Sequence, residues 1–113
     1  MKKLFVTITV ITVIAASSAF AGGDHFHPKQ IVKCGGPCSE TQIKGAVPEA
    51  IPYLNKWGKI DTAWTKATIE SVSQKQFKKG PEWVVTLADA SKQKRYLFFT
   101  LDGFVTGSNA TGE

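Results

Sequence analysis

The stretch "EWVVTLADASKQKRYLFFTLDGFVTGSN", residues 82–109, decides the fold of this 113-residue chain. Residues 82–88 place Trp83, Val85 and Leu87 on one face, a polar loop follows, and residues 95–101 are rich in aromatic and apolar side chains, which indicates two strands. The dipeptide Asp102-Gly103 predicts a two-residue hairpin turn with positive φ at both positions, leading into a last strand that begins at Phe104. Residues 66–77, closed by the turn "KKGP", form a further strand candidate. We therefore expect three or four antiparallel strands in a meander.

The segment before these strands, residues 39–57, predicts a helix. Ser39 followed by Gln42 matches a capping box, in which each side chain bonds a free backbone amide of the first turn. Pro48 and Pro52 each remove an amide donor, so we predict a kink, or two short helices meeting near Pro48. Whether the helix is kinked or divided in two, its apolar side chains form one stripe, which consists of Ile43, Val47, Ile51 and Leu54. The fold class is therefore α+β, with this N-terminal helix packed on one face of the sheet.

Phe98 and Phe99 are adjacent in a predicted strand, so their side chains point to opposite faces of the sheet. We expect one of them to lie outside the main core. It would mark a binding surface unless another part of the chain folds over it.

Residues 1–21 have the pattern of a secretory signal peptide. Lys2 and Lys3 precede the apolar run "LFVTITVITVIAA", and the segment ends in "SSAFA", with Ala19 and Ala21 at the positions that a signal peptidase reads. We expect cleavage near Ala21 and a periplasmic or secreted protein without a membrane span. The mature chain would comprise a flexible arm, residues 22–37, and a single α+β domain, residues 38–113. Its modest positive charge is dispersed and indicates a solvated surface rather than a nucleic-acid footprint.

The only histidines and cysteines of the chain are concentrated in the arm and at the start of the domain: His25, His27, Cys34 and Cys38. In an extended arm His25 and His27 point to the same side, so both imidazoles would bind one Cu or Zn ion, unless the arm is merely solvated. Outside the cytoplasm Cys34 and Cys38 favour a disulfide. The competing interpretation is a pair of thiolate metal ligands, which with the histidines would complete a set of four.

The sequence lacks the pattern of an enzyme site. No histidine lies beyond residue 27, which removes the commonest general base from the domain. The serines lack a nucleophile context, and Glu82, Asp89 and Asp102 fit strand, loop and turn positions better than an acid/base pair. We therefore expect a protein that is not an enzyme.

The order of a helix, "GKIDTAW", "EWVVTL" and "YLFFTLDGFVTGSNATG" resembles a family of small exported bacterial proteins of unknown function, and more widely the PepSY-like group. The resemblance covers residues 39–112 and implies one helix on a short antiparallel sheet. Some PepSY-like members are associated with protein interaction and peptidase inhibition. The leading hypothesis is an exported metal-binding protein that uses the arm. The alternative is an interaction or peptidase-inhibitor module, whose partner would be an envelope protein, with no metal role.

Overall fold

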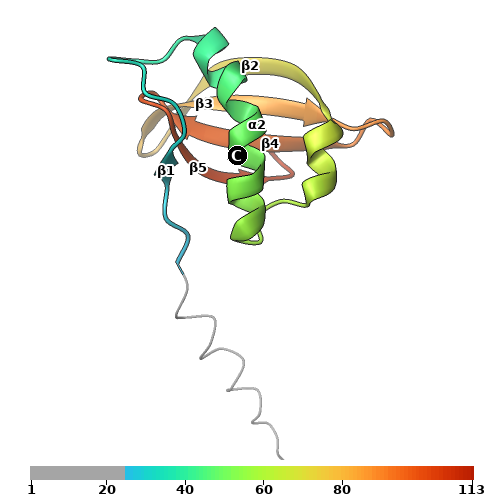
Figure 1. The fold of residues 1–113 in the computed structure, drawn as a ribbon. Coiled ribbons are helices and arrows are strands. Elements are labelled where there is room, and N and C mark those ends of the chain that lie inside the picture. Colours follow the sequence, from blue (N-terminus) through green and yellow to red (C-terminus); the bar gives the residue numbers. More distant parts are fainter. Residues whose placement is uncertain (1–24) are drawn as a thin grey trace, which may run out of the picture.

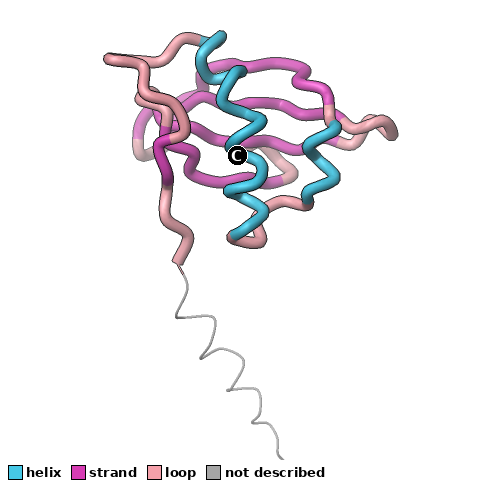
Figure 2. The backbone as a smooth tube through the Cα atoms, viewed as in Figure 1, coloured by secondary structure: helices cyan, strands magenta, loops and turns pink. Residues whose placement is uncertain are grey.

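A computed structural model describes residues 25–113 and shows one helix packed on one face of a five-stranded antiparallel sheet (Figures 1 and 2). The strand order is β1-β5-β4-β3-β2, so the last four strands form a meander. Among the described residues, no helix is long and apolar enough to cross a membrane. The elements, in chain order, are β1 (Lys29–Gln30), α2 (Glu40–Lys56), the 3-10 helix η2 (Thr62–Lys66), β2 (Thr68–Phe77), β3 (Gly80–Ala88), β4 (Lys94–Thr100) and β5 (Phe104–Asn109). The predicted α+β class is confirmed, with one strand more than the three or four expected.

Helix α2 begins with the predicted capping box. The Gln42 amide donates to Ser39 Oγ over 3.1 Å, and the Ser39 amide donates to Gln42 Oε1 over 2.9 Å. The helix continues through Pro48 and Pro52, so the expected alternative of two short helices is wrong. Both prolines lie on the exposed side, where water can satisfy the carbonyls that lose an amide partner. Packing of the opposite stripe then holds the helix together as one element.

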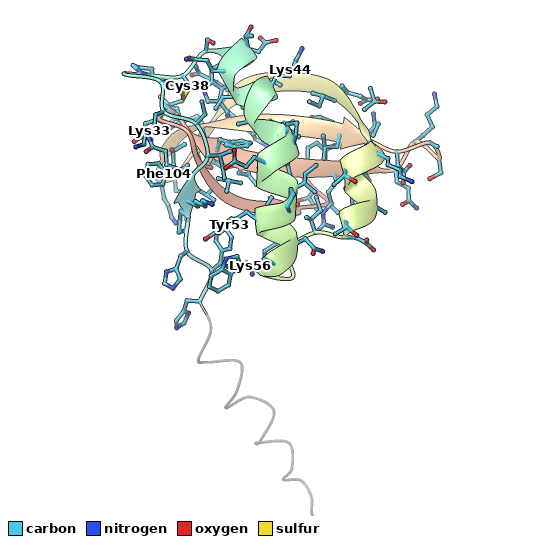
Figure 3. All side chains as sticks on the ribbon, in the orientation of Figure 1. Lys33, Cys38, Lys44, Tyr53, Lys56 and Phe104 are labelled. Atoms are coloured by element: carbon cyan, nitrogen blue, oxygen red, sulfur yellow. A yellow bond between two sulfur atoms is a disulfide. The ribbon has the colours of Figure 1, made fainter. Side chains whose placement is uncertain are left out.

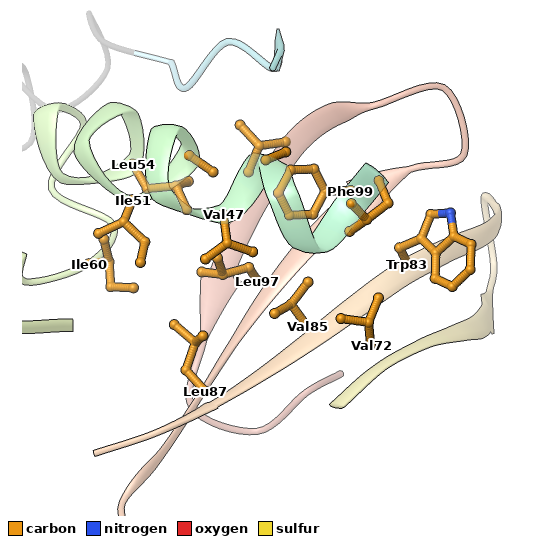
Figure 4. Close-up of a cluster of buried hydrophobic side chains, with 14 of the residues drawn as sticks. Val47, Ile51, Leu54, Ile60, Val72, Trp83, Val85, Leu87, Leu97 and Phe99 are labelled. Carbon is orange, nitrogen blue, oxygen red and sulfur yellow. The ribbon is translucent and has the colours of Figure 1, made fainter. Parts of the chain in front are cut away.

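The core lies between α2 and the sheet (Figure 4). All four residues of the predicted helical stripe are at most 3% exposed. They meet the inward side chains of β3 and β4, among which Val85, Leu97 and Phe99 are fully buried. Burial of such side chains contributes about 1.5–3 kcal/mol each, so this interface is the main source of stability.

Strands β4 and β5 form the predicted hairpin, but its turn differs from the prediction. Three residues, 101–103, connect the strands rather than two, and Gly103 has a φ of +94° whereas Asp102 does not have positive φ. The Gly103 amide donates to the Thr100 carbonyl over 3.1 Å. A three-residue connection needs positive φ only at its last position, which is where glycine stands.

The arm contributes the fifth strand, although we expected a flexible segment. Lys29 and Gln30 of β1 lie opposite Val105 and Phe104 of β5. The Ile31 amide then donates to the Gly103 carbonyl over 2.9 Å, so the arm also packs on the β4–β5 turn. The arm therefore lies against the domain along most of its described length.

The face of the sheet opposite α2 has its own small apolar layer. Phe99 lies in the main core, whereas Phe98 points to this outer face, as expected for neighbours in a strand, and is 8% exposed. The ring of Phe77 packs edge-on against Phe98, with centroids 5.8 Å apart. The end of the chain crosses the same face, where Lys75 Nζ donates to the Gly112 carbonyl over 3.0 Å. The C-terminal segment, rather than the arm, thus helps to cover this face.

Candidate functional site

Both histidines of the arm are exposed, and His27 lies beside the C-terminal end of α2. The Tyr53 hydroxyl donates to the backbone carbonyl of His27 over 2.6 Å, and Figure 3 shows Tyr53 reaching from α2 toward the arm. The imidazole of His27 packs edge-on against the indole of Trp57, with ring centroids 5.4 Å apart. His27 therefore has a fixed place on the domain surface while its ring remains open to solvent.

An aromatic cluster of Phe26, Tyr53 and Trp57 holds this part of the arm. The Phe26 ring lies 5.8 Å from Tyr53 and 5.8 Å from Trp57, centroid to centroid, in edge-to-face arrangements. Such pairs contribute about 0.5–1.5 kcal/mol each beyond the area that they bury. Lys29 Nζ adds a cation–π contact 5.2 Å from the Tyr53 ring centroid.

The sequence did not predict this aromatic cluster. Tyr53 lies on α2 and Trp57, four positions later, is the C-cap residue of this helix, so the two side chains lie on the same side of it, which was the available signal. Nothing local linked that face to Phe26, because the contact joins segments far apart in the chain.

Cys34 and Cys38 form a disulfide in the structure, which fits the favoured of the two predictions for this pair. Cys38 is 4% exposed and belongs to the hydrophobic core, and its amide donates to the Leu101 carbonyl over 2.7 Å. Gly35 and Gly36, both with positive φ, allow the tight loop between the two sulfurs. In this oxidised form neither sulfur is available as a thiolate ligand.

The four predicted metal ligands do not converge on one point. Across residues 25–113, no group of three or more His, Cys, Asp or Glu side chains lies close enough to hold a metal ion. With the cysteines joined to each other, His25 and His27 remain as exposed nitrogen donors. The predicted signal peptide lies outside the described residues.

Two acidic side chains of the domain, Asp89 and Glu70, form hydrogen bonds or an ion pair with nearby residues. Asp89 Oδ1 accepts from the Ser91 hydroxyl over 2.8 Å and from the amides of Ser91 and Gln93, each over 2.9 Å. The Ser91 hydroxyl and these amides hold the pKa of Asp89 below its ordinary value, against an opposing desolvation. Glu70 pairs with Lys94 at the surface. Asp89 thus closes the loop between β3 and β4.

Among known proteins, the chain matches one family model but no individual protein. No curated protein and no solved structure matches the chain. One family model matches it over residues 1–113, so the chain belongs to a family of unknown function, DUF6488.

Proposed function

We propose that this is an exported, non-enzymatic protein whose arm binds Cu(II) through His25 and His27, on a domain that is PepSY-like in its order of elements. The observation that carries the proposal is the position of His27. Its backbone is held by Tyr53 and its ring rests on Trp57, yet the imidazole is exposed. A partly ordered ligand loses less conformational freedom on binding than one in a free tail.

The donor set favours Cu(II) over the other ions considered. The disulfide removes the two soft ligands that would select Cu(I) or a zinc–thiolate site. Two imidazoles remain, and at nitrogen donors divalent copper binds more tightly than zinc. The remaining positions would be filled by water or by oxygen and nitrogen donors of the arm itself.

The proposal is tested by titrating the oxidised protein with Cu(II) and Zn(II) by calorimetry. The double variant His25→Ala, His27→Ala should bind Cu(II) at least about tenfold more weakly, since it loses every imidazole of the chain. Lys33→Ala, an exposed change in the same arm, is the matched control and should bind like the unaltered protein. Equal affinity of the double variant and the unaltered protein would refute the metal function.

Trp57 supplies a second readout that reports the place of binding. A Cu(II) ion lies about 2 Å from the imidazole nitrogen that binds it, and therefore close to the indole beside His27. Because Cu(II) is paramagnetic and Zn(II) is not, Cu(II) should quench the Trp57 fluorescence strongly and Zn(II) only weakly. Trp57→Phe should lose the quenching but keep the calorimetric binding. Quenching that survives in Trp57→Phe would place the ion elsewhere.

The alternative function, protein interaction or peptidase inhibition without a metal, makes the opposite prediction for the arm. Deleting residues 22–37 would then leave partner binding intact, and the histidine variants would behave like the unaltered protein. Export is tested separately, by mass spectrometry of the protein isolated from the cell envelope without reductant. Cleavage near Ala21 and the mass of the oxidised Cys34–Cys38 pair are the expected results.

A further inference from the structure

Strand β2 presents the long open edge of the sheet. It is last in the strand order, has ten residues, and pairs only with β3 among the described strands. The opposite edge is partly covered, because β1 pairs with β5 at Phe104 and Val105. An open edge exposes a row of backbone donors and acceptors that another strand can use.

The register with β3 shows which backbone groups of β2 face outward. Gln76 lies opposite Pro81, which has no amide proton, so this pair cannot exchange both backbone hydrogen bonds. Bonded and non-bonded pairs alternate in an antiparallel ladder. Lys75 and Ser73 are therefore bonded to β3. The backbone amides and carbonyls that point to the open edge belong to Val72, Gln74 and Gln76.

The features that usually keep an edge strand from pairing with another chain are weak in β2. Proline is absent from β2, and the one irregularity in its register lies near its start, between Ile69 and Ser71. Lys75 could repel a second strand, but its amine is turned over the outer face and bonded to the Gly112 carbonyl. The stretch from residue 71 to residue 77 is thus regular, and neither a proline nor a bulge protects it.

We propose that β2 pairs antiparallel with β2 of a second copy of this chain, across a two-fold axis at Gln74, so that two sheets become one. In this register each residue of β2 whose backbone groups face the open edge lies opposite another such residue of the second copy. Gln74 lies opposite Gln74 of the second copy, and Val72 lies opposite its Gln76. Lys75 faces Ser73 of the second copy, so no like charges oppose each other. Beyond the regular stretch, Glu70, which also pairs with Lys94 of its own chain, lies toward Lys78 of the second copy and has the opposite charge. This self-complementarity favours a second copy over an unrelated peptide.

The pairing is independent of metal binding. Strand β1 and the arm lie at the far edge of each sheet, so both arms of the dimer stay free. A single pair of strands buries less surface than a standard protein interface. The expected dissociation constant therefore lies between about 1 µM and about 1 mM.

Charge changes at Ser73 test both the dimer and its register by sedimentation equilibrium. Ser73→Lys places a lysine opposite Lys75 of the second copy, twice in each dimer, and should weaken dimerisation about tenfold. Ser73→Glu should strengthen it by a similar factor. Lys44→Glu, on the exposed side of α2, is the control and should leave the dissociation constant unchanged. If Ser73→Lys fails to fold by circular dichroism, Ser73→Glu alone decides.

Three results would overturn the inference. One is a protein that remains a monomer at about 1 mM, which would mean that the β2 edge does not pair. The second is a dimer whose dissociation constant neither Ser73 change alters, which would place the interface on another surface. The third is a tighter dimer for Ser73→Lys than for Ser73→Glu, which would exclude this register.

Discussion

Replacing Gly103 by alanine tests whether the arm is truly part of the folded domain. Gly103 is buried, its φ is +94°, and its carbonyl accepts the Ile31 amide of the arm. A Cβ atom added to Gly103 would lie 2.1 Å from the backbone carbonyl oxygen of Val32. Real Cβ atoms do not approach backbone that closely, so the arm or the β4–β5 turn must move.

The expected loss of stability has two parts. Holding alanine at this positive φ costs about 1–2 kcal/mol. Displacing the arm removes the Ile31–Gly103 hydrogen bond, whose net value is about 1 kcal/mol, together with some packing of Val32. We therefore expect Gly103→Ala to reduce the free energy of unfolding by about 2–4 kcal/mol.

Gly45→Ala is the matched control, because it makes the same chemical change with the opposite expected sign. Gly45 is an exposed interior residue of α2, and a Cβ there would meet no atom within 4 Å. Alanine is the better helix former by about 0.5–1 kcal/mol, so this variant should be more stable than the unaltered protein.

Thermal unfolding followed by circular dichroism separates the two variants. For a domain of this size 1 kcal/mol shifts the Tm by about 4–8 °C, so Gly103→Ala should lower it by on the order of 10–20 °C. Hydrogen exchange should locate the damage in the amides of Lys29, Gln30 and Ile31. A Gly103→Ala protein within about 0.5 kcal/mol of the unaltered one would refute the docking of the arm on this turn.

The remaining predictions concern the disulfide and Asp89. Replacing Cys34 and Cys38 together by alanine should lower the free energy of unfolding by about 2 kcal/mol, the loop-closure value for so short a loop, measured by urea denaturation; an unchanged midpoint in oxidised protein would contradict this. The hydrogen bonds that lower the Asp89 pKa should stabilise the fold above the ordinary aspartate pKa of about 3.9, and this contribution should be lost as the pH falls through the lowered value. Urea denaturation from about pH 6 down to about pH 2 should therefore show the advantage over Asp89→Asn shrinking, whereas a constant difference would argue against a charge effect.

The sequence by itself determined the main helix, the four strands of the meander and the faces that these elements bury. Helix α2, its capping box and its buried stripe follow from residue spacing, as do the core-facing side chains of β3 and the opposite directions of Phe98 and Phe99. These features depend on neighbours within a few positions, where the geometry of helix and strand fixes which side chains share a face. Burial of those faces then leaves one two-layer arrangement.

Only the tertiary structure decided how the arm is used. β1 has two residues, too few to show any periodicity, and it exists because β5 offers an edge that lies far along the chain. For the same reason the contact of Phe26 with Tyr53 and Trp57 left no local signal. Residue types allowed Cys34 and Cys38 either to bind metal or to bond to each other. In the structure they are bonded to each other, because the loop through Gly35 and Gly36 brings Cys34 close to Cys38, which packing holds in the core.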